Sequence, residues 1–171
     1  MKTTLTLLGA HMTRIADWAA RPLLRAMIDA SLVRAGQMPI PTDAPFVHAS
    51  GPDPDRILLI GTDAVMGFGV TSHELGFSGK VARRVSQLTG RGVDIEIAGS
   101  RTLTVEQATA LVAGYDLSRF DAVAIMLGGR DSAGFVDRAA WRARMGALRA
   151  AAAPVPKVFA LGIPDFTWNV E

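Results

Sequence analysis

The residues best placed to do chemistry follow a run of four apolar residues, Ile57 to Ile60. The run leads directly into Gly61, Thr62 and Asp63, which supply a hydroxyl and a carboxylate in a turn of small residues. An unbroken apolar run of this length is typical of a strand buried on both faces, as in a parallel sheet. Ligands of open α/β sheets bind just beyond the carboxyl ends of such strands. Thr62 and Asp63 are therefore the first candidates for a functional site.

A second group of polar residues follows another apolar run. The stretch 121–127 reads as a buried strand that ends at Gly128, and Arg130 and Asp131 come shortly after it. Asp63 and Asp131 have the carboxylates that a hard cation prefers. A guanidinium beside them favours an ion pair over a metal, so we predict no metal site here.

Three further polar side chains and a glycine pair are weaker candidates. His73 follows Ser72 near a predicted helix start, where we expect it to belong to the cap region. Ser100 and Ser132 follow the ends of predicted strands, but neither has an evident histidine partner. Gly67-x-Gly69 matches half of a dinucleotide-binding fingerprint and fails where position 72 is serine, so we expect no cofactor.

Composition excludes several kinds of site. The chain of 171 residues has no cysteine, which excludes disulfides, thiolate nucleophiles and cysteine metal sites. Its three histidines lack metal-ligand spacing, and no basic cluster is interleaved with aromatic residues as nucleic-acid binding would require. Without a clear signal peptide or an apolar run of about 18 residues, the sequence predicts a cytoplasmic or membrane-peripheral protein.

The elements that must position these residues alternate between strand and helix. Strands are predicted at 57–61, 93–98, 121–127 and 158–162, and the strand at 93–98 alternates apolar and acidic residues as a strand near an edge with one solvent-exposed face does. Helices are predicted from Ser72 to about Leu88, from Thr104 to about Ala113, and from Asp137 to Pro154. This alternation predicts a three-layer α/β domain of flavodoxin-like type, with a central parallel sheet of about four strands.

The residues before this domain divide into two parts. Residues 1–35 are predicted to be a helical segment, in which 13–35 has arginines and Trp18 near helical spacing. This helix either packs on the outer surface of the domain or lies on a membrane surface. Residues 36–55 carry five prolines and are predicted to be an extended connector to the domain at 56–171.

From residue 31 to 165 the order of these motifs resembles the SGNH (GDSL-type) hydrolases, in particular short lipase- or esterase-like members common in actinobacteria. The resemblance rests on the glycine-led turn after the strand at 57–60 and on the helix that contains Gly79 to Arg84. It also rests on the strand end at 97–102, and on the segment 127–131 with the Trp141 helix after it.

The resemblance implies a site in which the family's catalytic residues are replaced. The family's serine nucleophile matches Asp63, its glycine oxyanion donor matches Thr102, and its oxyanion asparagine matches Arg130. Asp131 matches a structural aspartate that would hold its loop through backbone N–H groups. The family's Asp-x-x-His motif, which supplies the base, has no counterpart, and Gly61, Thr62 and Gly128 would line the remaining site.

These substitutions lead to three functional hypotheses. The first is a catalytically inactive SGNH-like protein, retained for binding or as a partner subunit. The second is an active ester hydrolase with a non-standard nucleophile or a base from another chain, and the third is a fragment of a longer enzyme. We further predict an ion pair between Asp63 and Arg130. We also predict an open sheet edge through which homo- or hetero-oligomers form.

Overall fold

The computed structural model describes residues 22, 26, 38–134 and 136–162. The chain divides into two compact units, Met1–Gln37 and Met38–Glu171. In the first unit, Pro22 and Ala26 are helical and exposed, and the rest of the helix predicted over 13–35 lies outside the described residues. None of the helices in the described ranges has the length and apolar character needed to cross a membrane.

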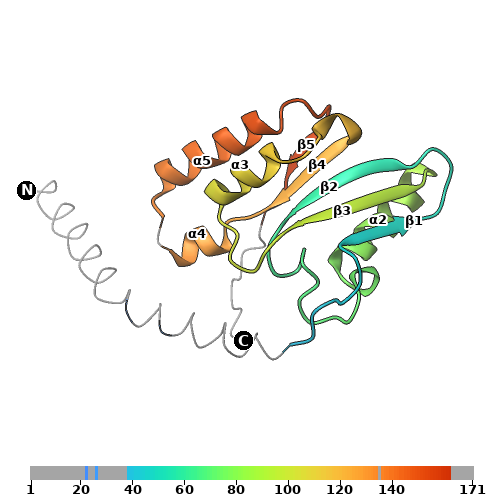
Figure 1. The fold of residues 1–171 in the computed structure, drawn as a ribbon, viewed down its shortest axis with the longest axis horizontal. Coiled ribbons are helices and arrows are strands. Elements are labelled where there is room, and N and C mark those ends of the chain that lie inside the picture. Colours follow the sequence, from blue (N-terminus) through green and yellow to red (C-terminus); the bar gives the residue numbers. More distant parts are fainter. Residues whose placement is uncertain (1–21, 23–25, 27–37, 135, 163–171) are drawn as a thin grey trace, which may run out of the picture. The chain divides into compact units, whose positions relative to one another are not determined.

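The second unit is a mixed α/β domain built on one mostly parallel sheet of five strands (Figure 1). The strands are β1 (Phe46–Ala49), β2 (Asp55–Gly61), β3 (Val93–Gly99), β4 (Ala122–Met126) and β5 (Val158–Ala160). The helices are α2 (Phe77–Thr89), α3 (Val105–Ala113), α4 (Gly129–Ala133) and α5 (Arg138–Ala151), with 3-10 turns at His73–Leu75 and Leu117–Arg119. The strand order is β1-β3-β2-β4-β5, and only β1 runs antiparallel to its neighbour.

The prediction that 36–55 is only an extended connector is wrong, because β1 lies within it. None of the five prolines of this stretch falls in β1, so its backbone N–H groups remain available for pairing. β1 pairs with β3, and its buried residues Val47 and Ala49 join the core. The sheet therefore has five strands rather than about four. β3 lies second from the edge, between β1 and β2, which confirms the prediction of a strand near an edge.

The chain reverses its direction across the sheet at β2. From β2, α2 leads to β3 on one side, and α3 then leads to β4 on the other side of β2. β2 and β4 are parallel neighbours, so their carboxyl ends lie side by side. Ligands of open α/β sheets bind outside the carboxyl ends at such a reversal. The turn after β2 and the loop after β4 therefore meet where the fold predicts a ligand site.

Each face of the sheet has its own core, because side chains alternate along the strands. Leu58 and Ile60 of β2 pack with buried residues of α3 and α5 on one face. Leu59 packs with Ile95 and with α2 on the other face. The predicted placement of helices on both faces is confirmed, and the capping box that begins α3 at Thr104 is present as predicted.

Two glycines allow the strands to approach each other at this edge. Gly61 and Gly99 are paired at the ends of β2 and β3. A Cβ atom added at Gly99 would lie 2.0 Å from the carbonyl oxygen of Gly61, and one added at Gly61 would lie 2.8 Å from that of Met126. Any side chain at either position would push the strands apart, so these glycines determine where the loops converge.

We expect Gly99→Ala to lower the free energy of unfolding by about 3 kcal/mol, the upper end of the usual cost of overpacking. Urea unfolding followed by circular dichroism measures this change. Gly146→Ala is the matched control, because Gly146 lies within α5 with open space around it. That substitution should raise stability by about 0.5–1 kcal/mol through helix propensity. An unchanged urea midpoint for Gly99→Ala would contradict the close approach.

Candidate functional site

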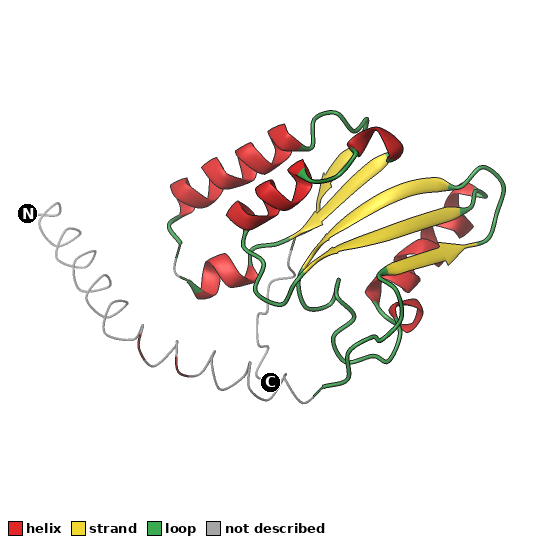
Figure 2. Ribbon diagram, viewed as in Figure 1, coloured by secondary structure: helices red, strands yellow, loops and turns green. Residues whose placement is uncertain are grey.

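The loops that follow β2, β3 and β4 leave the sheet at the same edge (Figure 2). In the turn after β2, Thr62 is buried and its carbonyl accepts a hydrogen bond from the Val65 N–H at 2.9 Å. Asp63 is exposed and has a φ of 43°. This left-handed backbone conformation is uncommon for residues other than glycine, asparagine and aspartate. The turn therefore presents the Asp63 carboxylate to solvent beside the reversal point.

The predicted ion pair between Asp63 and Arg130 is wrong. Within the described part of the chain, neither side chain forms a hydrogen bond or an ion pair. Arg130 is half-buried in the first turn of α4, which begins after the unusual backbone of Gly128 at φ 128°. The two loops follow neighbouring parallel strands and so leave the same end of the sheet, but Asp63 lies in a left-handed turn and Arg130 in a short helix, and their side chains do not pair.

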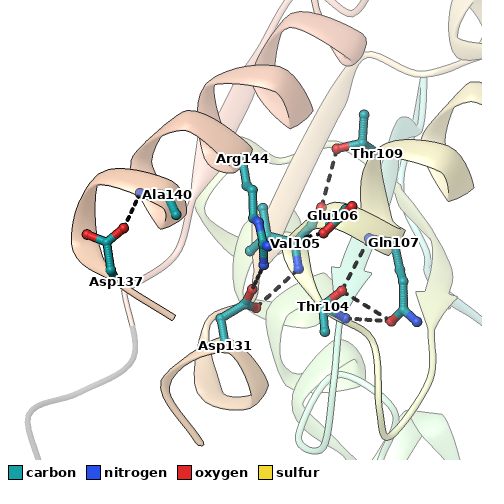
Figure 3. A network of polar contacts seen from close by, with 9 residues as sticks. All are labelled: Thr104, Val105, Glu106, Gln107, Thr109, Asp131, Asp137, Ala140 and Arg144. Atoms are coloured by element: carbon teal, nitrogen blue, oxygen red, sulfur yellow. Dashed lines mark hydrogen bonds and ion pairs between the residues drawn. The ribbon is translucent and has the colours of Figure 1, made fainter. Parts of the chain in front are cut away.

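Asp131 is the most buried charged residue at this edge, with a side chain only 1% exposed. Its Oδ2 accepts a hydrogen bond from the Val105 N–H of α3 at 3.1 Å (Figure 3). Its Oδ1 lies 3.7 Å from Nη1 of Arg144 on α5 and has no hydrogen-bond partner among the described residues. Asp131 therefore accepts a backbone N–H as the resemblance implies, but from a neighbouring helix rather than from its own loop.

This network joins three helices behind the loop that follows β4. Arg144 also contacts Glu106 at 3.3 Å, so one guanidinium from α5 reaches both α3 and α4 (Figure 3). The first turn of α3 is further held by the reciprocal bonds of Thr104 and Gln107. Because Asp131 is adjacent to Arg130, the network sets the position of the α4 residues that face the sheet edge.

The loop after β3 contributes exposed residues and one stacking contact. Ser100 and Thr102 are both exposed in this turn. The guanidinium of Arg101 lies 4.4 Å from the centre of the Phe68 ring, which joins this loop to the one after β2. The Thr102 position thus lies at the same edge as Asp63, as the alignment with the resembled family implies.

The described histidines are both held by carboxylates. His73 is buried, and its Nδ1 and backbone N–H contact Asp43 at 2.9 and 3.0 Å. His48 is exposed and contacts Asp94 at 2.7 Å. Desolvation opposes ionisation of Asp43, but the bonds from His73 outweigh it and hold the pKa of this carboxyl below its ordinary value. Nothing in the sequence singles out Asp43, because the pairing spans 30 residues.

A hollow of about 690 Å³ lies beside the loop after β4. Gly128 and Ser132 border it, and Trp141 and Met145 of α5 form an apolar wall. The sequence places Trp141 and Met145 on one helix face, which usually indicates core, and only the three-dimensional arrangement shows that they line an open space. No group of side chains in the described residues is arranged to hold a metal ion.

Comparison with models of known protein families and with curated protein sequences gives no match. The resemblance to SGNH hydrolases therefore remains a hypothesis based on the motifs in this sequence.

We expect Asp131→Ala to destabilise the domain by about 1–3 kcal/mol, because the buried Val105 N–H loses its acceptor. The neighbouring substitution Arg130→Gln is the control and should change stability by less than about 0.5 kcal/mol, since the Arg130 side chain makes no hydrogen bond or ion pair with another described residue. Urea unfolding of both variants gives the comparison. Equal losses in the two variants would contradict the structural role of Asp131.

Asp137 provides a test of pH dependence. Its carboxylate begins α5 by accepting N–H bonds from Ala139 and Ala140, which hold the pKa of Asp137 below its ordinary value. A lowered pKa in the folded state stabilises the protein above the unfolded-state pKa of about 4, and this contribution is lost as the pH falls through the folded-state value. The difference in urea midpoint between the native protein and Asp137→Ala should therefore be largest at neutral pH and shrink below about pH 4.

Asp137→Asn is the matched control for this prediction, because asparagine keeps the cap but does not titrate. Its urea midpoint relative to Asp137→Ala should show no such decline in acid. A difference between the native protein and Asp137→Ala that stays constant from pH 7 to pH 3 would contradict the prediction.

Proposed function

We propose that this protein is a catalytically inactive relative of the SGNH hydrolases. It uses the surface at the carboxyl ends of its parallel strands for binding. The observation that carries the proposal is Asp63, an exposed carboxylate in the turn where the resembled family has its serine. A carboxylate is already ionised at neutral pH, so a base cannot activate it as it activates a serine hydroxyl.

The surroundings of Asp63 also argue against ester hydrolysis by the serine route. An oxyanion hole works by meeting a negative charge as it develops in the transition state. A permanent negative charge at 63 repels that developing charge. Arg130 replaces the neutral asparagine that the family uses as a donor, so the polar groups at this edge suit a bound ligand better than an acyl transition state.

The groups that remain suit a ligand with both donor and acceptor atoms. Asp63 offers an exposed acceptor, and Arg130 offers a half-buried guanidinium, and neither is engaged by another described side chain. The adjacent hollow with its Trp141 wall gives room for an apolar part of such a ligand. Retention of this edge for binding, with or without a partner subunit, accounts for all three features.

One observation favours an active hydrolase as a second candidate function. Asp43 holds Nδ1 of His73, as a carboxylate orients the histidine base in catalytic triads, and this leaves Nε2 for proton transfer. His73 is only 4% exposed, however, and a base must reach its substrate directly or through one water. The burial of His73 makes this the weaker of the two candidates.

An ester-hydrolysis assay separates the two candidates. We expect the native protein to hydrolyse short p-nitrophenyl esters no faster than buffer and to resist labelling by a serine-directed phosphonate. Asp63→Ser, run alongside, should gain little activity, because loss of the oxyanion donor alone costs about 10²–10³-fold and the base is also missing.

Each outcome of the assay supports one of the two candidate functions. Native activity that the phosphonate abolishes would overturn the proposal. Native activity that survives the phosphonate but disappears in both His73→Gln and Asp43→Asn would identify the second candidate. Circular dichroism of each variant would show that its fold is retained.

A further inference from the structure

The face of the sheet that carries α2 is only partly covered in the described residues. α2 packs over β3 and β1, whereas α3 and α5 lie on the opposite face. Beside α2 an apolar groove of about 450 Å³ runs over β2, β4 and β5. We refer to this feature as the α2 groove.

The walls and floor of the α2 groove follow directly from the sequence. One wall is a stripe along α2 in which every fourth residue faces the groove: Phe77, Val81, Val85 and Thr89. The floor comes from alternate residues of three paired strands and the residue after β5: Ile57, Leu59, Ala122, Ala124, Phe159 and Leu161. Alanine at both β4 positions leaves the floor low between larger neighbours, which makes the face a trench rather than a flat surface.

This groove is too apolar to be left in water without a cost. Burial of apolar surface contributes about 25 cal/mol per Å². Phe159, at the rim, is 51% exposed despite being a large aromatic residue in a strand. An apolar segment laid in the groove would therefore be stabilised by burying Phe159 and the apolar lining.

We propose that residues 163–171 of the same chain lie in the α2 groove. Leu161 is the last residue that lines the groove, so the following segment begins at its carboxyl end. The groove extends back along β5 to Lys157, four residues earlier, which is about 13 Å of strand. Nine residues span about 13 Å as a helix and up to about 30 Å when extended, so the segment reaches the far end in either form.

The residue types of the segment suit this occupant. Ile163, Phe166 and Val170 are spaced i, i+3 and i+7, which would place them on one face of a helix. Glu171 would arrive near Lys157, an exposed cation at the far rim that pairs with no described residue. The two acidic residues at that rim are already engaged, because Asp55 contacts Arg91 and Asp121 contacts Arg56. Among the described residues of the rim, the charge left uncommitted is thus opposite to the charge at the end of the segment.

Engineered cysteine pairs in the full chain test the proposal, because the native sequence has no cysteine. The test pair is Val81→Cys with Phe166→Cys, and the control pair is Leu88→Cys with Phe166→Cys. Leu88 also lies on α2, but it is 68% exposed and does not line the groove. We expect mild oxidation to give an intramolecular disulfide at least about tenfold faster in the test pair, since docking raises the effective concentration of the two thiols.

The remaining outcomes overturn the proposal. Equal rates for the two pairs would show that the segment does not occupy the groove. A disulfide-linked dimer formed faster by the test pair would assign the groove to a second copy of the chain. A second pair, Phe159→Cys with Val170→Cys, gives an independent reading if Val81→Cys disturbs folding, and circular dichroism of each variant verifies its fold.

Discussion

The close backbone approach at Gly61 is the constraint on which the rest of the structure depends. Gly61 lies between Gly99 of β3 and Met126 of β4, where a Cβ atom on either glycine would meet the carbonyl of the adjacent strand. This approach brings three strand ends together, and the loops that follow them share one edge. The reversal of strand order at β2 then makes that edge the natural ligand site of the fold. Small residues thus position a site to which they contribute no functional group.

The helices stabilise the same edge through a buried charge. Asp131 ties α4 to α3 through a backbone N–H, and Arg144 of α5 approaches from the other side. A buried carboxylate with an oxygen that lacks a hydrogen bond from any described residue is costly, so such a residue persists where it fixes a geometry. The three-helix contact holds the α4 loop firmly, while no described residue engages the charges of Asp63 and Arg130 beside it. This support, with the polar groups of Asp63 and Arg130 in front of it, is the arrangement on which the proposed binding function rests.

Local signals predicted most of the regular elements correctly. The apolar runs correspond to β2, β3, β4 and β5, and the capping residues Thr104 and Asp137 begin helices as expected. One local signal was wrong, because Ser72 makes no capping bond through its side chain and α2 begins only at Phe77, after Gly76. The errors in the strands arose where pairing is non-local. β1 is only four residues long and lies among prolines, so its strand character depends on β3, which is more than 40 residues away.

The candidate site was likewise only partly predictable from the sequence. Residue patterns alone were enough to locate the strand ends that Asp63, Thr102 and Arg130 follow. They could not decide whether Asp63 and Arg130 meet, because side-chain direction depends on the backbone of a left-handed turn and of a short helix. They also could not reveal the Asp43–His73 pair or the α2 groove. Both features arise when segments far apart in the chain pack together, and only the folded structure determines which of those segments become neighbours.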